Sequence, residues 1–94
     1  MTRTFADLLR VARGEIREVT PQEASRLLAD PRTALVDVRE DGEWEQGHIP
    51  GARHVARSSL EQQIEAAVAD RATPLVLYCA AGIRSLFAAQ ALRA

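Results

Sequence analysis

Residues 75–86 read LVLYCAAGIRSL, and this stretch decides the fold. Residues 75–79 place four apolar side chains before Cys79, a pattern typical of a strand that is buried on both faces of a parallel sheet. The small residues at 80–82 allow a tight connection, and residues 84–93 then form a predicted helix. The stretch therefore predicts a strand, a short loop and a helix in succession.

A second strand of the same kind is predicted at residues 34–38 (ALVDV), where Asp37 is the one polar residue. Weaker patterns predict two further strands, at residues 15–19 and 52–56. Apolar side chains at helical spacing predict helices over residues 4–13, 20–30, 58–72 and 84–93. This alternation predicts one domain over residues 1–94 with an open parallel α/β sheet and helices on both faces.

Capping residues mark the expected helix boundaries. Thr20 and Glu23 have the spacing of a capping box, and Ser58 and Glu61 repeat it. Gly14 is expected to end the first helix, since glycine is common just past a helix C-terminus.

The composition excludes several classes of function. The formal charge is −1, which argues against a nucleic-acid or anionic-membrane partner. All 12 basic residues are arginine, so a phosphate-binding lysine and a Schiff-base lysine are excluded. Cys79 is the single cysteine and cannot form an internal disulfide, and no apolar run resembles a signal peptide or a membrane span. The expected location is a reducing cytoplasm.

Cys79 is the candidate nucleophile. It ends a predicted strand, where ligands bind in open α/β sheets, and the loop after it can turn backbone N–H groups toward one point. The following helix directs its positive N-terminal dipole at the same point. Such surroundings lower a thiol pKa below its usual value of about 8.5, which favours the reactive thiolate. The alternative is that Cys79 is only a small buried apolar residue.

Residues 79–85 (CAAGIRS) resemble the C-x-x-G-x-R-S loop of the rhodanese-like sulfurtransferases. Residues 35–52 (LVDVREDGEWEQGHIPGA) resemble that family's second hallmark, a D-x-R motif, an acidic-aromatic pair and G-H-I-x-G-A. The two motifs occur in the family's order and together cover about half of the chain. The resemblance implies a rhodanese fold in which Cys79 accepts a sulfane sulfur as a persulfide and passes it to a thiophilic acceptor.

The resemblance also implies roles for the neighbours of Cys79. Arg84 either pairs with a carboxylate, Asp37 or Glu40, or binds the substrate anion, and the two roles can coexist. Asp37 and Arg39 are expected to support the loop through charge and hydrogen bonds, together with Ser85. The expected anion-binding residues are Ala80, Ala81, Gly82, Ile83 and Arg84.

Four residues near the second hallmark are expected to be structural. Glu43 and Trp44 are predicted to pack the loop, and His48 to bond its own backbone within the turn. His54 is expected to lie partly buried in a short strand. Two histidines and one cysteine do not have the spacing of a metal site, so no metal or other cofactor is expected.

The loop departs from the thiosulfate-processing members, which often carry Arg or Lys where this chain has Ala80 and Ala81. Thiosulfate is therefore expected to bind less tightly, and a protein-bound persulfide is the alternative donor. Four residues separate Cys79 from Arg84, one fewer than in the C-x5-R loop of phosphatases with a related fold. The smaller ring suits a sulfur atom on cysteine rather than a phosphoryl group.

Three functions compete at this point. The first is a sulfurtransferase. The second is a sulfur-relay partner of an adenylating enzyme that acts on a small carrier protein, since the N-terminal stretch is similar to rhodanese domains associated with such enzymes. The third is a rhodanese fold used only for protein interaction, against which the presence of Cys79 argues.

Rhodanese domains normally continue into another strand, an L-x-G-G turn and a final helix, and none of these follows Ala94. In the family's sheet that strand lies beside the strand at residues 75–79. The expectation is therefore a C-terminally incomplete domain lacking the usual last strand and helix. It would be part of a longer protein, or it would repair the open edge by dimerising or by moving residues 15–19 into the gap.

Overall fold

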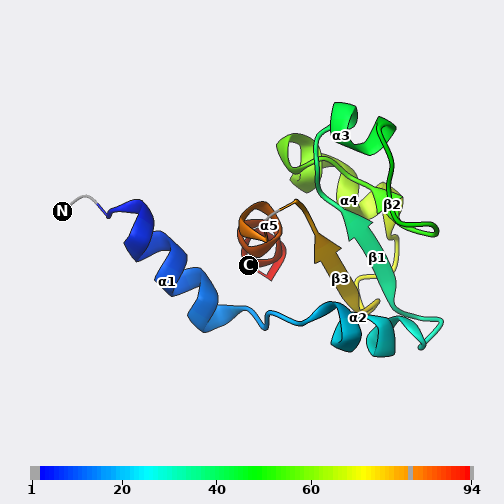
Figure 1. Ribbon diagram of the computed structural model, residues 1–94, viewed down its shortest axis with the longest axis horizontal. Helices are drawn as coiled ribbons and strands as arrows, with labels where there is room; N and C mark the ends of the chain where they lie inside the picture. Colours follow the sequence, from blue (N-terminus) through cyan, green and yellow to red (C-terminus); the bar gives the residue numbers. More distant parts are fainter. Residues whose placement is uncertain (1–2, 81, 94) are drawn as a thin grey trace.

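The computed structural model describes residues 3–80 and 82–93, which form a parallel sheet with helices packed on it (Figure 1). The elements in chain order are α1 Phe5–Glu15, α2 Pro21–Leu28, β1 Ala34–Asp37, α3 Asp41–Glu45, β2 Arg53–His54, a 3-10 turn Arg57–Ser59, α4 Leu60–Ala67, β3 Leu75–Tyr78 and α5 Ile83–Arg93. The fold class predicted from the sequence is confirmed.

The sheet has the strand order β2-β1-β3, and both pairings are parallel. The register places Asp37 beside Tyr78, so β1 and β3 end at the same level. The segments that follow the two strands, which begin at Val38 and Cys79, therefore leave the sheet at one edge. This register brings the two sequence hallmarks together.

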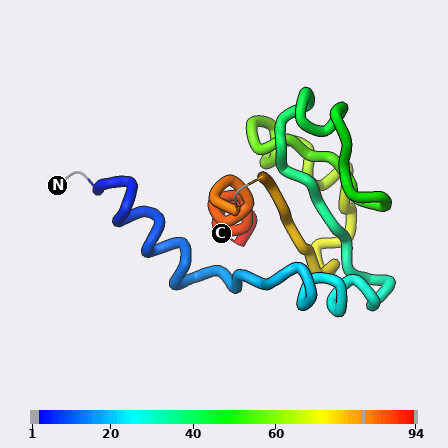
Figure 2. The backbone as a smooth tube through the Cα atoms, viewed as in Figure 1, coloured from blue at the N-terminus to red at the C-terminus, as the bar shows by residue number. Residues whose placement is uncertain are grey.

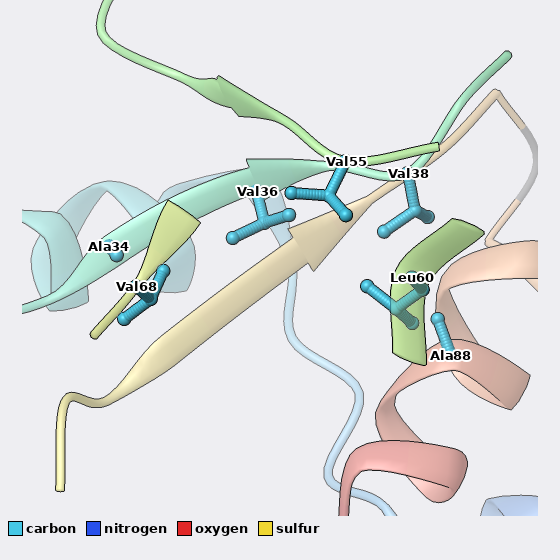
Figure 3. Packing of buried hydrophobic residues seen from close by; sticks show 7 residues of the cluster. All are labelled: Ala34, Val36, Val38, Val55, Leu60, Val68 and Ala88. Atoms are coloured by element: carbon cyan, nitrogen blue, oxygen red, sulfur yellow. The ribbon is translucent and has the colours of Figure 1, made fainter. Parts of the chain in front are cut away.

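The buried hydrophobic cluster lies on one face of the sheet. Alternate residues of β1 and its extension, Ala34, Val36 and Val38, share that face because side chains alternate along a strand. Helices α4 and α5 pack against it (Figure 3). The buried cluster consists of Ala34, Val36, Val38, Val55, Leu60, Val68 and Ala88.

Helix capping follows the sequence prediction at α2 and departs from it at α4. Thr20 and Glu23 form the predicted capping box, each bonding the other's backbone N–H at 3.1 Å. Helix α4 instead has Ser59 at its N-cap. The predicted cap at Ser58 is wrong, because Ser58 lies within the 3-10 turn that precedes α4. Its hydroxyl donates to the Glu40 carboxylate at 3.1 Å.

The strand predicted at residues 15–19 is also wrong. Helix α1 continues through Gly14 to Glu15, and α5 holds this end because Arg93 donates to the Glu15 carbonyl at 2.6 Å and Gln90 donates to its carboxylate at 3.0 Å. Residues 16–19 then run as irregular backbone and line a pocket of about 610 Å³ opposite β3. Among the described residues, β3 pairs with β1 alone.

Helix α1 lies apart from the sheet (Figure 2). It contacts α5. Phe5 and Phe87 meet there with ring centroids 6.2 Å apart, and Ala12 is fully buried. In the described part of the chain, no helix combines the length and apolar character needed to cross a membrane.

Candidate functional site

Cys79 lies between the end of β3 and the start of α5 and is partly buried. It borders two hollows. The larger is the pocket of about 610 Å³ beside β3. The smaller, of about 440 Å³, is open to solvent and is lined by Arg39, Gly47, His48, Ile49, Pro50, Tyr78, Cys79 and Ala80.

Backbone N–H groups converge on the Cys79 sulfur. Gly82 N–H donates to Sγ at 3.1 Å and Ser85 N–H donates at 3.4 Å. The Ser85 hydroxyl accepts from the Cys79 thiol at 3.5 Å and donates to the Gly82 carbonyl at 3.2 Å, which ties the loop to the first turn of α5. Donors aimed at one atom stabilise negative charge on it. The geometry therefore suits a thiolate at Cys79.

The loop needs glycine at position 82. Its φ is +83°, a backbone conformation that side-chain-bearing residues adopt at a cost. Of the other predicted anion-binding residues, Ala80 is exposed, Ile83 begins α5 with its side chain exposed, and Ala81 lies outside the described residues.

Arg84, on the first turn of α5, binds Glu43 of α3. Its Nη1 and Nη2 donate to the two carboxylate oxygens at 2.5 and 2.9 Å. The hydrogen bonds from Arg84 are the main cause that lowers the pKa of Glu43 to about 2, and the pair raises the pKa of Arg84. The sequence prediction that Arg84 pairs with Asp37 or Glu40 is therefore wrong, although an ion pair at this residue was expected.

Asp37 and Arg39 pair with each other. The Asp37 carboxylate is fully buried and accepts from the Arg39 backbone N–H at 2.8 Å and from Nε and Nη2 at 2.8–3.1 Å. Burial acts to raise the pKa of Asp37, but the hydrogen bonds from Arg39 and the Tyr78 hydroxyl outweigh it and hold this pKa below its ordinary value. Arg39 Nη2 also donates to the Gly47 carbonyl at 2.7 Å, which fixes the turn bordering the smaller hollow.

Tyr78 is a site residue that the sequence reasoning missed. Its hydroxyl accepts from the Ile49 N–H at 3.2 Å, and the Arg39 guanidinium lies 5.6 Å from its ring centroid. Burial raises its pKa. The available signal was a tyrosine directly before Cys79 in an apolar strand, because a phenol in that position needs a polar partner.

Trp44 is the centre of an aromatic cluster. The His48 ring stacks on it at 3.4 Å between centroids and the His54 ring at 4.7 Å. His48 Nδ1 donates to the Trp44 carbonyl at 3.1 Å, and His54 Nε2 donates to the Arg39 carbonyl at 2.8 Å. His48 thus bonds the backbone of its own turn, as predicted, and His54 lies partly buried in the short strand β2, also as predicted. Within residues 3–80 and 82–93, no three His, Cys, Asp or Glu side chains gather in a way that could hold a metal.

The site places a cysteine at the carboxyl end of a parallel strand with backbone N–H groups donating to its sulfur, an arrangement that favours the thiolate form of a cysteine. The model of the rhodanese-like domain family matches residues 20–94, and the chain belongs to this family. The family predicted from the two sequence hallmarks is confirmed.

Three relatives illustrate the similarity. YqhL of Bacillus subtilis, an uncharacterised protein, is 45% identical over 62 residues, which are 66% of this chain and 48% of that protein. The human single-domain sulfurtransferase TSTD1 has a TM-score of 0.70 and 32% identity over 83% of this chain and 80% of its own. RPA3614 of Rhodopseudomonas palustris has a TM-score of 0.78 and 30% identity, and the match covers 99% of this chain and 77% of RPA3614. RPA3614 is of unknown function and is described as a possible tyrosine phosphatase. The matched region thus spans about half of YqhL.

Proposed function

We propose that the protein is a sulfurtransferase that carries sulfur on Cys79 and that residues 1–94 act as one rhodanese-like domain. The observation that carries the proposal is the pair of N–H groups, from Gly82 and Ser85, that donate to Sγ at 3.1 and 3.4 Å. They stabilise negative charge on Sγ when Cys79 is a thiolate. Family membership and the sulfurtransferase TSTD1 among the structural neighbours support the same activity.

The reaction has two steps. The Cys79 thiolate attacks the sulfane sulfur of the donor, the donor's bond to that sulfur breaks, and the leaving group departs with the electron pair. With thiosulfate the leaving group is sulfite. An acceptor nucleophile then attacks the outer sulfur of the persulfide, and the S–S bond breaks to return the Cys79 thiolate. Cyanide as acceptor gives thiocyanate.

The donor is either thiosulfate or a persulfide on another protein. A protein-bound persulfide can approach Cys79 through the smaller hollow, because two residues that line this hollow are exposed: Ile49, at 48%, and Ala80. The acceptor is a thiophile or an activated carboxylate on a small carrier protein served by an adenylating enzyme. Reconstitution with a persulfide-bearing protein would show transfer without a small-molecule donor.

Intact mass spectrometry tests the proposal. After incubation with thiosulfate and removal of the small molecules, we expect one added sulfur on Cys79, which cyanide then removes. The matched control is Cys79→Ser, in which the hydroxyl is similar in size and is a poor nucleophile at neutral pH. Thiocyanate production by Cys79→Ser, or no added sulfur on the wild-type protein with any sulfane donor, would overturn the assignment.

The same preparation should not hydrolyse aryl phosphates. The loop between Cys79 and Arg84 has four residues. The N–H groups of Gly82 and Ser85 lie within hydrogen-bonding distance of a single sulfur atom. Hydrolysis of p-nitrophenyl phosphate at a rate comparable with sulfur transfer would favour a phosphatase instead.

A further inference from the structure

The arginines around Cys79 are already paired with carboxylates. Arg84 is held by both oxygens of Glu43 at 2.5 and 2.9 Å, and the Glu40 backbone N–H donates to the same carboxylate at 3.3 Å. The two charged side chains of this pair are 36% and 37% exposed. Arg84 directly precedes Ser85, whose N–H donates to the Cys79 sulfur at 3.4 Å, so the charge of Arg84 lies close to the reacting residue.

Two further arginines line the hollows, and each has a carboxylate partner. Arg39 in the smaller hollow is paired with the buried Asp37 at 2.8 Å. Arg17 in the larger pocket lies 3.4 Å from Glu23. Ala80 contributes no charge to the loop. The site therefore offers an incoming anion N–H groups and paired guanidinium groups, and the Cys79 thiolate adds its own negative charge.

We propose that Glu43 is a specificity-determining residue: by pairing with Arg84 it cancels the positive charge beside Cys79 and so selects donors with one negative charge, such as persulfides and thiosulfonates, over the thiosulfate dianion. This inference rests on the proposed sulfurtransferase function. It assigns the donor class to a charge contributed by α3, a different element from the loop that carries Cys79.

Electrostatics gives the direction and size of the effect. The repulsion that a carboxylate exerts on a donor scales with the donor's charge, so a dianion loses about twice as much free energy as a monoanion. Thiosulfate and methanethiosulfonate differ in this respect and transfer the same atom. In each case the Cys79 thiolate attacks the sulfane sulfur, the donor's S–S bond breaks, and sulfite or methanesulfinate leaves with the electron pair.

The test is the second-order rate constant for adding one sulfur to Cys79, measured by intact mass spectrometry with each donor. Glu43→Gln keeps the size of the side chain and an oxygen that can accept from Arg84, but it removes the charge. We expect the thiosulfate rate constant to rise about tenfold and the methanethiosulfonate rate constant about threefold, so that their ratio rises about threefold. An unchanged or lowered ratio would mean that Glu43 only positions Arg84, and would overturn the proposal.

Glu45→Gln is the matched control, because Glu45 is exposed on the same helix and removal of its charge changes the net charge equally. We expect its ratio to equal that of the wild-type protein, and an equal rise in both variants would overturn the role of Glu43. Absence of added sulfur with both donors would overturn the proposed function and this inference with it. If sulfur is added but Glu43→Gln leaves the ratio of the thiosulfate and methanethiosulfonate rate constants unchanged, this inference alone would be overturned.

A second measurement needs no variant and covers the case in which Glu43→Gln fails to fold. Salt screens repulsion between a negatively charged site and a negatively charged donor. Between about 0.02 M and about 0.5 M salt, we expect the wild-type rate constant to rise more with thiosulfate than with methanethiosulfonate. A thiosulfate rate constant that falls with salt would show a net positive site and would overturn the proposal.

Discussion

Asp37, the last residue of β1, forms an ion pair with Arg39, two residues further along the chain, at an N–O distance of 2.8 Å. The Asp37 carboxylate is fully buried. The same guanidinium reaches the Gly47 carbonyl, eight residues further along the chain, at 2.7 Å. The pair therefore joins the central strand to the turn that borders the smaller hollow. Its removal should affect both the stability of the fold and the shape of the site.

Asp37→Asn should destabilise the protein by about 3 kcal/mol, because it leaves Arg39, whose side chain is 18% exposed, without its counter-charge. Asp30→Asn is the matched control: Arg32 binds Asp30 with the same two-residue spacing, but its side chain is 80% exposed. That control should cost much less, because an exposed ion pair contributes little to stability. Urea unfolding measures both, and equal losses would contradict the importance of burial.

The Glu43–Arg84 pair should make stability depend on pH in the acid range. The pKa of Glu43 is about 2 in the folded protein and 4.5 ordinarily, so the pair's contribution is complete above about 4.5 and is lost as pH falls toward about 2. The urea midpoints of the wild-type protein and Glu43→Gln should differ by a constant amount above pH 5 and converge below it. A difference that persists unchanged at pH 2 would argue against this carboxylate as the cause.

Gly82→Ala should cost about 1–2 kcal/mol, because φ of +83° is unfavourable for alanine, and should slow the addition of sulfur to Cys79. The control is Gly14→Ala. Gly14 lies inside α1 with open space at the Cβ position, and there alanine should stabilise the protein by roughly 0.5–1 kcal/mol. In thermal melts, we expect Gly82→Ala to lower the melting temperature and Gly14→Ala to raise it. Destabilisation by both substitutions would contradict this prediction.

Ala80→Arg should raise the rate of sulfur transfer from thiosulfate roughly fivefold by adding an unpaired cation at the rim of the smaller hollow. Ala66→Arg adds the same charge at an exposed position of α4 and should leave the rate near that of the wild-type protein. Steady-state assays with cyanide as acceptor measure both variants. No gain at position 80 would indicate that this side chain points away from the donor.

Local sequence patterns predicted most of the elements that carry the site. The apolar runs at residues 34–38 and 75–79 predicted β1 and β3, and the Thr20–Glu23 capping box predicted the start of α2. These patterns succeed because a buried strand and a capped helix depend on residues close together in the sequence. The position of Cys79 between a strand and a helix follows from the same local signals.

The sequence by itself determined the family, the two central strands, the capping of α2 and the candidate nucleophile Cys79. Each of these depends on residues that are close together in the sequence. Only the tertiary structure decided which carboxylate holds Arg84, because Asp37, Glu40 and Glu43 are all 41 or more residues away in the chain. The choice depends on where the short helix α3 packs against the first turn of α5. Long-range packing also explains why residues 15–19 do not form the expected strand. Helix α5 binds Glu15, which is the last residue of α1, and residues 16–19 continue as irregular backbone that does not pair with β3.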